Sequence, residues 1–506
     1  MDSKVLRWNF VFQYGWVITN VINSILLLPL YVKNIDSSTL GVWLATSGVL
    51  YWMTIIDPGV GEVLQQKIAE LRGKKEFNEI GHYIGSGLIS SMFILLMAVL
   101  VGFICYYSLG FIINKDVSKY PGLSVALLLT IIATGMSLVS FTLTGINQGL
   151  HNSAHVAISS LTANFLFLIV NLVFLYWGYG VMSIAIANLV RAVYINIFNY
   201  ASLLGLLNKN GIKIMFIKSH FKSFIKIFSF TSASRIITGL SNSIDMVALA
   251  RFISPDMITV YEINKRPLNL TNTLIGRHSV ALMPLISHSK GSGEHKSIVT
   301  LLSKQFKLYI YAAIFAAFMF AINYDNLIRL WVGTGKFIGN NLLYLLIILN
   351  FVALVSYFMS NVGYALGDIK KNSQYLIIRN IIYGVLVFFA AKYFGIPGTI
   401  VVALVMSFVC DFFFFSYRVF KLGYLEMSLV KSLNIVWFAC IPLCALMTWF
   451  INSVLQKLLP ENLYLAKMMF SSGVFALFFI TLVLLIDSNL RNALKSFKNK
   501  IFLRFA

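Results

Sequence analysis

The sequence predicts an all-helical, polytopic membrane protein, and three observations support this fold class. Of its 506 residues 58% are hydrophobic and only 11% are charged, whereas roughly a quarter of the residues of soluble proteins are charged. Apolar stretches of the roughly 20 residues that cross a bilayer recur along the whole chain. The Lys and Arg residues, which give a net charge of +22, gather in alternate connecting segments, as the positive-inside rule requires. This distribution argues against a nucleic-acid-binding surface.

Fourteen stretches are long and apolar enough to be membrane spans. They lie at 8–32, 38–57, 84–113, 121–147, 155–177, 181–207, 225–252, 258–286, 305–323, 341–366, 375–395, 398–417, 432–452 and 464–486. The connections between them are short, so we expect no folded domain outside the membrane. Both termini are expected in the cytoplasm, where the basic segments and the basic tail would face anionic lipid headgroups.

A faint internal repeat suggests two related halves. When the sequence is slid along itself, one common offset aligns Ile35 with Ile253 and Gly145 with Gly363, although apolar helical sequence also matches itself by chance. We expect an N-terminal lobe at 1–207 with helices 1–6, a basic cytoplasmic linker at 208–224, a C-terminal lobe at 225–421 with helices 7–12, and helices 13 and 14 with a basic tail at 422–506. Two six-helix lobes of equal orientation would be related by a pseudo-two-fold axis around a central cavity.

The seventh span carries a row of polar side chains. Thr231, Arg235, Thr238, Asn242 and Asp245 follow one another at spacings of four, three, four and three residues, which places them on one helix face. This face is either the wall of a hydrated cavity or a helix seam joined by hydrogen bonds. Because charged side chains are costly in hydrocarbon, Arg235 and Asp245 favour the cavity.

The eighth span begins with a second polar row. Glu262, Lys265 and Arg266 lie within five residues, and Asn269 and Asn272 continue the same side. Three charges so close together are not expected to face lipid. The alternative is that this run lies outside the hydrocarbon and that the helix starts after it.

Two further polar residues complete the candidate site. Arg191 lies near the middle of the sixth span, and Asn20 in the first span corresponds to Thr238 in the repeat. The candidate cations, Arg191, Arg235, Lys265 and Arg266, outnumber the candidate anions. Guanidinium groups bind phosphate oxygens in pairs, so this excess suits an anionic headgroup such as a pyrophosphate. Asp245 and Glu262 either bind a coupling ion, H+ or Na+, or balance the cations.

The sequence contains no Walker A, Gly-x-Ser-x-Gly or His-Glu-x-x-His motif. We therefore expect a transporter rather than an enzyme, with no cofactor and no metal. Without an ATP site, transport would be passive or coupled to a gradient.

Residues 40–71 resemble the second span and the following cytoplasmic helix of Wzx-type polysaccharide flippases, which belong to the multidrug/oligosaccharidyl-lipid/polysaccharide (MOP) exporter superfamily. An L-G-x-W stretch precedes an Asp-x-Gly-x-Gly turn, and the chain has Leu40, Gly41, Trp43, Asp57, Gly59 and Gly61 at these positions. The small-residue turn at 363–370 is similar to the corresponding turn of that family.

The resemblance implies a flippase of the bacterial inner membrane. It implies that an undecaprenyl-pyrophosphate-linked oligosaccharide, such as an O-antigen or capsule repeat unit, crosses to the periplasmic leaflet by alternating access, and that polysaccharide polymerase and assembly proteins are partners. Fourteen spans also resemble the lipid II flippase branch. Two rival classes stay open: a multidrug exporter would favour an acidic cavity, and an O-antigen polymerase or ligase would need a large outer loop.

Overall fold

The computed structural model describes residues 3–57, 59–216, 237–291, 293, 295–425, 433–434, 436–454, 460, 463–487 and 490–492. Every regular element in these ranges is helical. The helices are α1 (Ser3–Asn34), α2 (Ser37–Tyr51), α3 (Val60–Gly73), α4 (Phe77–Ile113), α5 (Leu123–Gly149), α6 (Ser153–Tyr176), α7 (Val181–Asn210), α9 (Ile244–Phe252), α10 (Pro255–Gly291), α11 (His295–Val332), α12 (Asn340–Ala365), α13 (Ile369–Val405), α14 (Phe413–Lys421), α16 (Ile441–Ser453) and α17 (Tyr464–Ile486). Short 3-10 helices at Trp52–Ile56 and Val117–Lys119 and π-helical segments at Met406–Phe412 and Val436–Cys440 complete the set.

The predicted fold class is confirmed, since ten helices of the described part are long and apolar enough to cross a membrane. One of them, 370–421, contains both the eleventh and the twelfth predicted spans. The two spans are separated by Gly395, whose φ of 60° and ψ of −140° are not helical. Helices α1 and α10 are not among the ten. The length and hydropathy of the apolar stretches therefore predict most of the spans. Helix α10 is an exception, because it carries the polar row.

The described helices cluster into two compact units. The first contains residues 1–259 and 376–399, and the second contains 260–375 and 400–506. This division differs from the predicted lobes, because 237–259 and 376–399 pack with the first six spans. The compact units are defined by contacts in one conformation, whereas the predicted lobes are defined by the sequence repeat. The lobe boundaries therefore stay a prediction.

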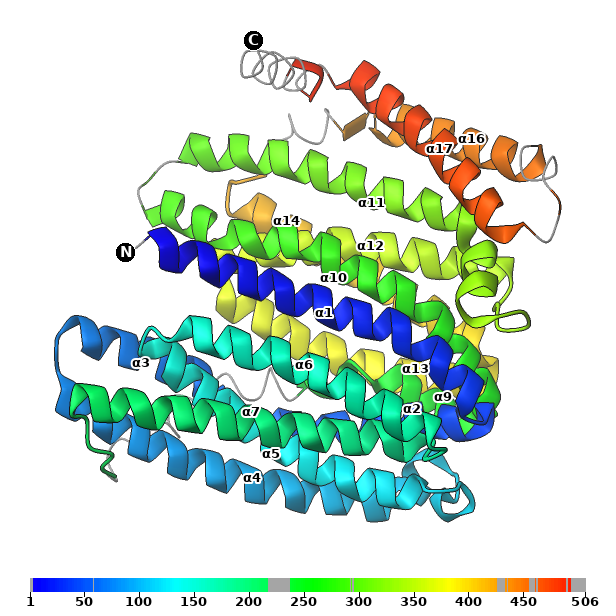
Figure 1. The fold of residues 1–506 in the computed structure, drawn as a ribbon. Helices are drawn as coiled ribbons and strands as arrows, with labels where there is room; N and C mark the ends of the chain where they lie inside the picture. The colour runs from blue at the N-terminus through cyan, green and yellow to red at the C-terminus, as the bar shows by residue number, and fades with distance from the viewer. Residues whose placement is uncertain are drawn as a thin grey trace, which may run out of the picture. The chain divides into compact units, whose positions relative to one another are not determined.

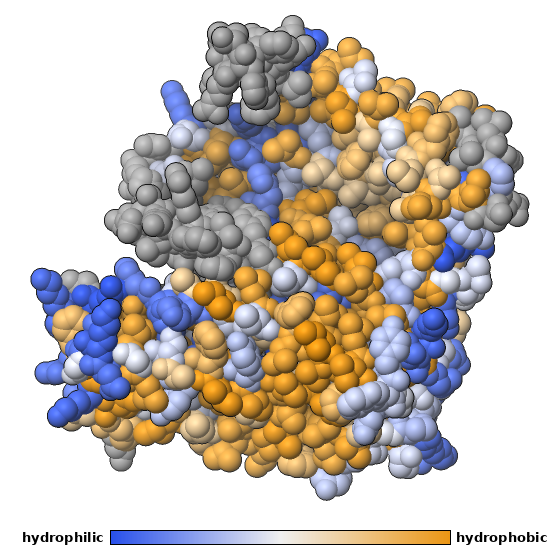
Figure 2. Space-filling view, viewed as in Figure 1, coloured by the Kyte–Doolittle hydropathy of each residue, from blue (hydrophilic) through white to orange (hydrophobic). Residues whose placement is uncertain are grey.

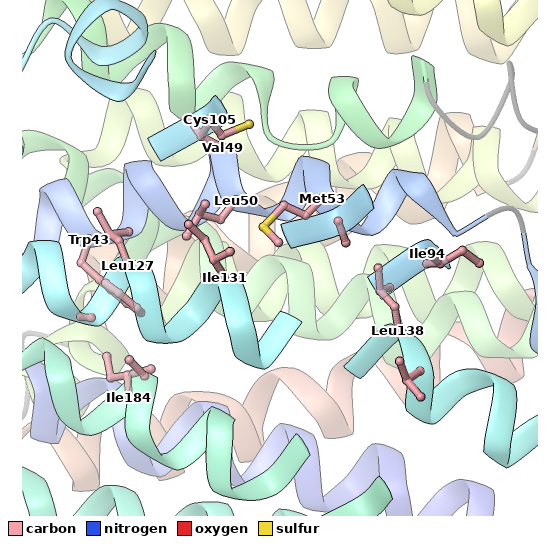
Figure 3. Close-up of a cluster of buried hydrophobic side chains, with 14 of the residues drawn as sticks. Trp43, Val49, Leu50, Met53, Ile94, Cys105, Leu127, Ile131, Leu138 and Ile184 are labelled. Carbon is pink, nitrogen blue, oxygen red and sulfur yellow. The ribbon is translucent and has the colours of Figure 1, made fainter. Parts of the chain in front are cut away.

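The first unit is built around α5. Helices α3, α4 and α7 contact α5, α6 packs on α7, and α1 packs on α6; Figure 1 shows α4, α5, α6 and α7 running side by side. Trp43, Leu50 and Met53 of the second span pack with Leu127 and Ile131 of α5 in a buried apolar cluster (Figure 3). On the surface of these helices Figure 2 shows an apolar band between hydrophilic ends, as expected of a membrane-spanning unit.

The second unit has an aromatic core. Helix α11 contacts α12, α16 and α17, and α12 also contacts α14. The rings of Tyr309 and Phe358 lie 4.9 Å apart between centroids, and those of Phe315 and Phe475 lie 6.0 Å apart. Tyr309, Phe358 and Phe475 are fully buried. Aromatic pairs at these separations add to the stabilisation from buried area.

The residues that carry the family resemblance form a close helix contact. The Asp57 carboxylate accepts hydrogen bonds from the backbone N–H groups of Gly59 and Val60, at 3.0 and 3.1 Å, and so caps α3. A Cβ added to Gly61 would lie 2.3 Å from the carbonyl oxygen of Phe141, and one added to Gly145 would lie 2.0 Å from the carbonyl oxygen of Gly61. Only glycine lets the backbones of α3 and α5 approach this closely.

Both halves of the chain repeat the same series of helix boundaries. The paired positions are the first residues of α2 and α10 (Ser37, Pro255), the positive-φ glycines before α5 and α12 (Gly122, Gly339), the left-handed residues after α5 and α12 (His151, Gly367), the positive-φ glycines before α7 and within α13 (Gly180, Gly395), and the positive-φ glycines after α7 and α14 (Gly211, Gly423). Gly180 and Gly395 share an unusual conformation, with φ of 52° and 60° and ψ of −128° and −140°.

The spacing between paired positions is not constant. It is widest for Ser37 and Pro255 and narrows at each successive pair, so that it is shortest for Gly211 and Gly423. The repeat is therefore present in the backbone, although a constant offset does not describe it.

The ends of α5 and α12 share one hydrogen-bond pattern. Asn152 N–H donates to Asn147 C=O, and Asp368 N–H donates to Gly363 C=O, each closing a turn around the left-handed residue before it. After α12 the Asp368 carboxylate also binds Arg418 of α14 through two hydrogen bonds of 2.6 Å. Partial burial and the nearby Arg72 lower the pKa of His151, the left-handed residue after α5.

Candidate functional site

Arg191 is half-buried in α7 of the first unit. Its guanidinium lies over the ring of Phe167 in α6, 5.2 Å from the ring centroid. Such a contact holds a cation against an apolar helix without neutralising it. That Arg191 faces a cavity stays a prediction.

The row of polar residues in the seventh span is interrupted. The described helix pauses in a turn at Asn242 and Ser243 before α9 begins, and Ser243 has φ −119° and ψ 3°. The expectation of one uninterrupted helix is wrong here, because the Ser243 hydroxyl instead accepts a hydrogen bond from Trp52 Nε1, at 2.9 Å, and donates to Gly48 C=O, at 3.0 Å. This contact fixes α9 on the second span.

The predicted residues around this turn differ in burial. Asp245 is only 7% exposed in the first turn of α9, while Asn242 is exposed. Thr238 Oγ1 accepts a hydrogen bond from Asn380 of α13, at 3.2 Å, so Thr238 serves as a helix contact. Arg235 lies outside the described residues. Among the described residues of this span, Asp245 is therefore a buried charge.

The charged run of the eighth span is helical. Helix α10 begins at Pro255, seven residues before Glu262, which excludes a helix that starts only after the run. Glu262, Lys265 and Arg266 are half-buried, and the Lys265 ammonium lies 5.3 Å from the ring centroid of Tyr261. The spacing of three and four residues places all three charges on one helix face.

The two amides that follow on α10 have different surroundings. Asn269 is exposed, and Asn272 is half-buried. The Asn272 Oδ1 atom is buried and accepts no hydrogen bond from any described residue. An unsatisfied buried oxygen is costly, so it is available to a donor from water or a ligand.

Sequence reasoning did not single out the buried asparagines that join helices of the first unit. Asn164 Nδ2 donates to Thr19 Oγ1, at 3.2 Å, and Asn171 Nδ2 donates to the Tyr31 hydroxyl, at 2.6 Å. Both join α6 to α1, the helix that carries Asn20, which is half-buried. The sequence alone does not distinguish such a seam from a cavity wall, since both place amides at helical spacing.

The candidate residues thus fall into two groups. Asn20, Arg191, Thr238, Asn242 and Asp245 belong to the first unit, and Glu262, Lys265, Arg266, Asn269 and Asn272 belong to the second. Within the second unit all five lie on one face of α10. A single cavity that both groups would line stays a prediction.

Comparisons with known proteins identify the family and the fold of this chain. Residues 8–290 match the model of the family described as polysaccharide biosynthesis protein. Among solved structures, the chain is similar to a multidrug resistance MATE family transporter of the MOP superfamily in an inward-facing conformation, with a TM-score of 0.69 and 13% identity over 80% of this chain and 95% of that chain. No curated protein sequence matches.

Two other solved structures have the same fold. The lipid II flippase MurJ, in an inward closed conformation, has a TM-score of 0.65 and 16% identity over 94% of this chain and 98% of that chain. The Vibrio cholerae MATE transporter VcmN, in a bent form, has a TM-score of 0.54 and 15% identity over 86% of this chain and 98% of that chain. This chain therefore shares its fold with a MATE family transporter of the MOP superfamily and with MurJ, in agreement with the sequence resemblance.

The architecture defines a multi-pass membrane protein with a transporter fold. Because the family model covers more than half of the chain, the protein belongs to the polysaccharide biosynthesis protein family.

Proposed function

We propose that this protein is a flippase that moves an undecaprenyl-pyrophosphate-linked oligosaccharide from the cytoplasmic to the periplasmic leaflet of a bacterial inner membrane. The observation that carries the proposal is the set of cations held half-buried within helices, Arg191 in α7 and Lys265 and Arg266 in α10. Membership of a polysaccharide biosynthesis family and the MOP fold support it. Polysaccharide polymerase and assembly proteins are the expected partners.

The energetic barrier to flipping lies in the head of the lipid. A sugar and a diphosphate are costly to move through hydrocarbon, whereas a polyprenyl tail is already soluble there. Cations fixed along a hydrated path lower this barrier, and guanidinium groups such as Arg191 and Arg266 present paired donors that match phosphate oxygens. The tail would remain in the lipid while the head passes.

Alternating access needs two conformations of similar free energy and a ligand that binds them differently. Asp245 is a buried carboxylate in the first unit, and Glu262 is half-buried in α10. We propose that H+ or Na+ binding at one of these carboxylates couples the cycle to an ion gradient, with no cofactor. Proteoliposomes with an imposed H+ or Na+ gradient would identify the ion by the gradient that accelerates flipping.

A lipid II flippase is the second candidate. The similarity to the lipid II flippase MurJ extends over 94% of this chain. Both candidates move a pyrophosphate-linked lipid, and they differ in the sugar. A multidrug exporter, as the similar MATE structure suggests, would favour carboxylates over the cations of α7 and α10.

A flipping assay tests the proposal directly. Proteoliposomes would carry an undecaprenyl-pyrophosphate-linked sugar with a fluorophore on the sugar, and a membrane-impermeant quencher would report its arrival in the outer leaflet. We expect Arg266→Gln and Arg191→Gln each to slow flipping about tenfold or more, because each removes charge-assisted hydrogen bonds to the head.

Lys296→Gln is the control, since Lys296 is an exposed cation in the first turn of α11, outside the charged face of α10. It should flip at the wild-type rate. Undiminished flipping by the Arg191→Gln/Arg266→Gln double variant would contradict the proposal. Transport of an ethidium cation in preference to the lipid would favour the multidrug exporter.

A further inference from the structure

A groove of about 610 Å³ lies between the start of α6 and one face of α7 in the first unit. Helices α6 and α7 run side by side there (Figure 1). The α7 wall includes Tyr194, Phe198, Gly205 and Lys209. These residues recur at spacings of four, seven and four, so they share one helix face.

The groove is lined by both apolar and polar side chains. Tyr194, Ile197, Phe198, Ala201 and Leu206 form its long wall. Asn152, His155, Ser202 and Lys209 are its polar lining residues; Asn152 is hydrogen-bonded to Ser202, and Lys209 lies seven residues further along α7. Among the described residues that line the groove, none is acidic.

Two of the polar side chains that line the groove are exposed and carry donors for an anion. Asn152 Nδ2 is already used, because it donates to Ser202 Oγ, at 2.6 Å, and to Asn147 Oδ1, at 3.2 Å. The Lys209 ammonium and the His155 ring are both exposed. Their charge and donors complement a phosphate.

The length of the groove matches one leaflet of a bilayer. From Tyr194 to Lys209 is 15 residues, which is about 22 Å along a helix. Half of a bilayer with its headgroups is about 20–22 Å thick. An acyl chain laid along the wall would therefore reach Tyr194 with its phosphate at Lys209.

We infer that the groove between α6 and α7 binds one anionic phospholipid, with its phosphate at Lys209 and His155 and an acyl chain along the aromatic wall of α7. Lipid binding in this groove does not depend on the proposed transport activity. Its occupant is a lipid of the surrounding membrane rather than the transported one.

Gly205 offers a way to fill the groove without disturbing the fold. A Cβ added there would meet no atom within 4 Å, so Gly205→Leu would project into open space. Gly473 on α17 is also helical and also has no atom within 4 Å. Gly473→Leu is therefore the matched control for adding a leucine to an open helix position.

Lipid binding would be measured on the full-length protein in detergent by native mass spectrometry with phosphatidylglycerol and phosphatidylcholine of equal chain length. We expect phosphatidylglycerol to bind several-fold more tightly. Lys209→Gln should weaken phosphatidylglycerol about fivefold, as expected for one interfacial cation, and leave phosphatidylcholine unchanged. Lys213→Gln, an exposed lysine outside the groove, should change neither.

Gly205→Leu should abolish binding of both lipids at this site, while Gly473→Leu should not. Elution volume and thermal stability of the lipid-free variants would confirm that each is folded. Binding that is unaffected by both Lys209→Gln and Gly205→Leu would overturn the inference. Displacement of phosphatidylglycerol by equimolar undecaprenyl phosphate would also overturn it, because the groove would then belong to the polyprenyl lipid.

Discussion

Arg418 and Asp368 show how one pair of side chains holds a helix end. Both carboxylate oxygens of Asp368 accept from the Arg418 guanidinium, and the two side chains are only 8% and 17% exposed. Asp368 directly follows the left-handed Gly367 at the end of α12. The pair therefore joins the turn after α12 to α14, in a geometry that only a planar guanidinium provides.

Arg418→Ala should lower the free energy of unfolding by about 2–4 kcal/mol, because it leaves a nearly buried carboxylate without its partner. Arg418→Lys should recover only part of this, since an ammonium cannot bind both oxygens in parallel. Thermal unfolding in detergent would measure both variants. In a double-mutant cycle, Asp368→Asn should cost little once Arg418 is already Ala. Independent, additive losses would show that the pair is not coupled.

At the residue scale, the sequence predicts which charged side chains are buried better than it predicts which partner a polar side chain binds. The cost of ionised groups in hydrocarbon singles out Arg191 and Asp245, and both are at least half-buried. Spacing alone singles out Thr238, but it binds Asn380, a residue 142 positions away. Helical spacing reveals which side chains share a face, whereas the partner of that face depends on tertiary packing.

At the element scale, glycines decide how closely helices approach. Gly61 and Gly145 bring the backbones of α3 and α5 together, and Gly41 brings α2 against the carbonyl oxygen of Pro255, which would lie 1.9 Å from an added Cβ. In membranes such small residues permit the van der Waals contact that drives helix association. The glycines of the motif that resembles polysaccharide flippases therefore allow close packing of helices in this fold.

Gly145→Ala and Gly205→Ala should have opposite effects on stability. The first forces two backbones apart and should cost about 1–3 kcal/mol. The second adds a methyl group to open space on α7 and should be neutral or stabilise by up to about 1 kcal/mol, because alanine favours helix. Apparent melting temperatures in the same detergent would compare them. Equal behaviour of the two variants would refute the close contact of α3 and α5.

The sequence predicts helices well because span length and hydropathy follow from the thickness of the bilayer. It does not predict the turn at Asn242–Ser243, since the hydrogen bonds of Ser243 join it to Trp52 and Gly48, far earlier in the chain. It does place the break at Gly395, since the eleventh predicted span ends at 395 and the twelfth starts at 398. A break that depends on partners far away in the chain is not visible in local hydropathy.

At the scale of the whole molecule, the halves share a framework of helix ends. The same order of left-handed turns and unusual glycines occurs twice, and the separation between paired positions shortens steadily along the chain. A constant offset therefore loses its register after α2 and α10. At least one of these shortenings lies within a helix, since α5 has 27 residues and α12 has 26.

Gly180→Ala and Gly395→Ala should destabilise the protein by similar amounts. Both glycines combine a positive φ with a strongly negative ψ, a region that L-residues avoid, and neither would meet an atom closer than 3.5 Å through an added Cβ. The cost is therefore conformational, about 1–3 kcal/mol for each. Thermal unfolding would test this, with Gly473→Ala as the control that should not destabilise. A loss at only one of the two glycines would argue against equivalent turns.

The paired glycines also locate the counterpart of Arg191. Arg191 lies eleven residues after Gly180, and the residue eleven positions after Gly395 is Met406, where the π-helical segment begins. One copy of the motif thus presents a permanent cation and the other an uncharged thioether. The two halves therefore share backbone turns without sharing charge; Met406 is buried, so of the two positions Arg191 is the one that offers a charge to an anion.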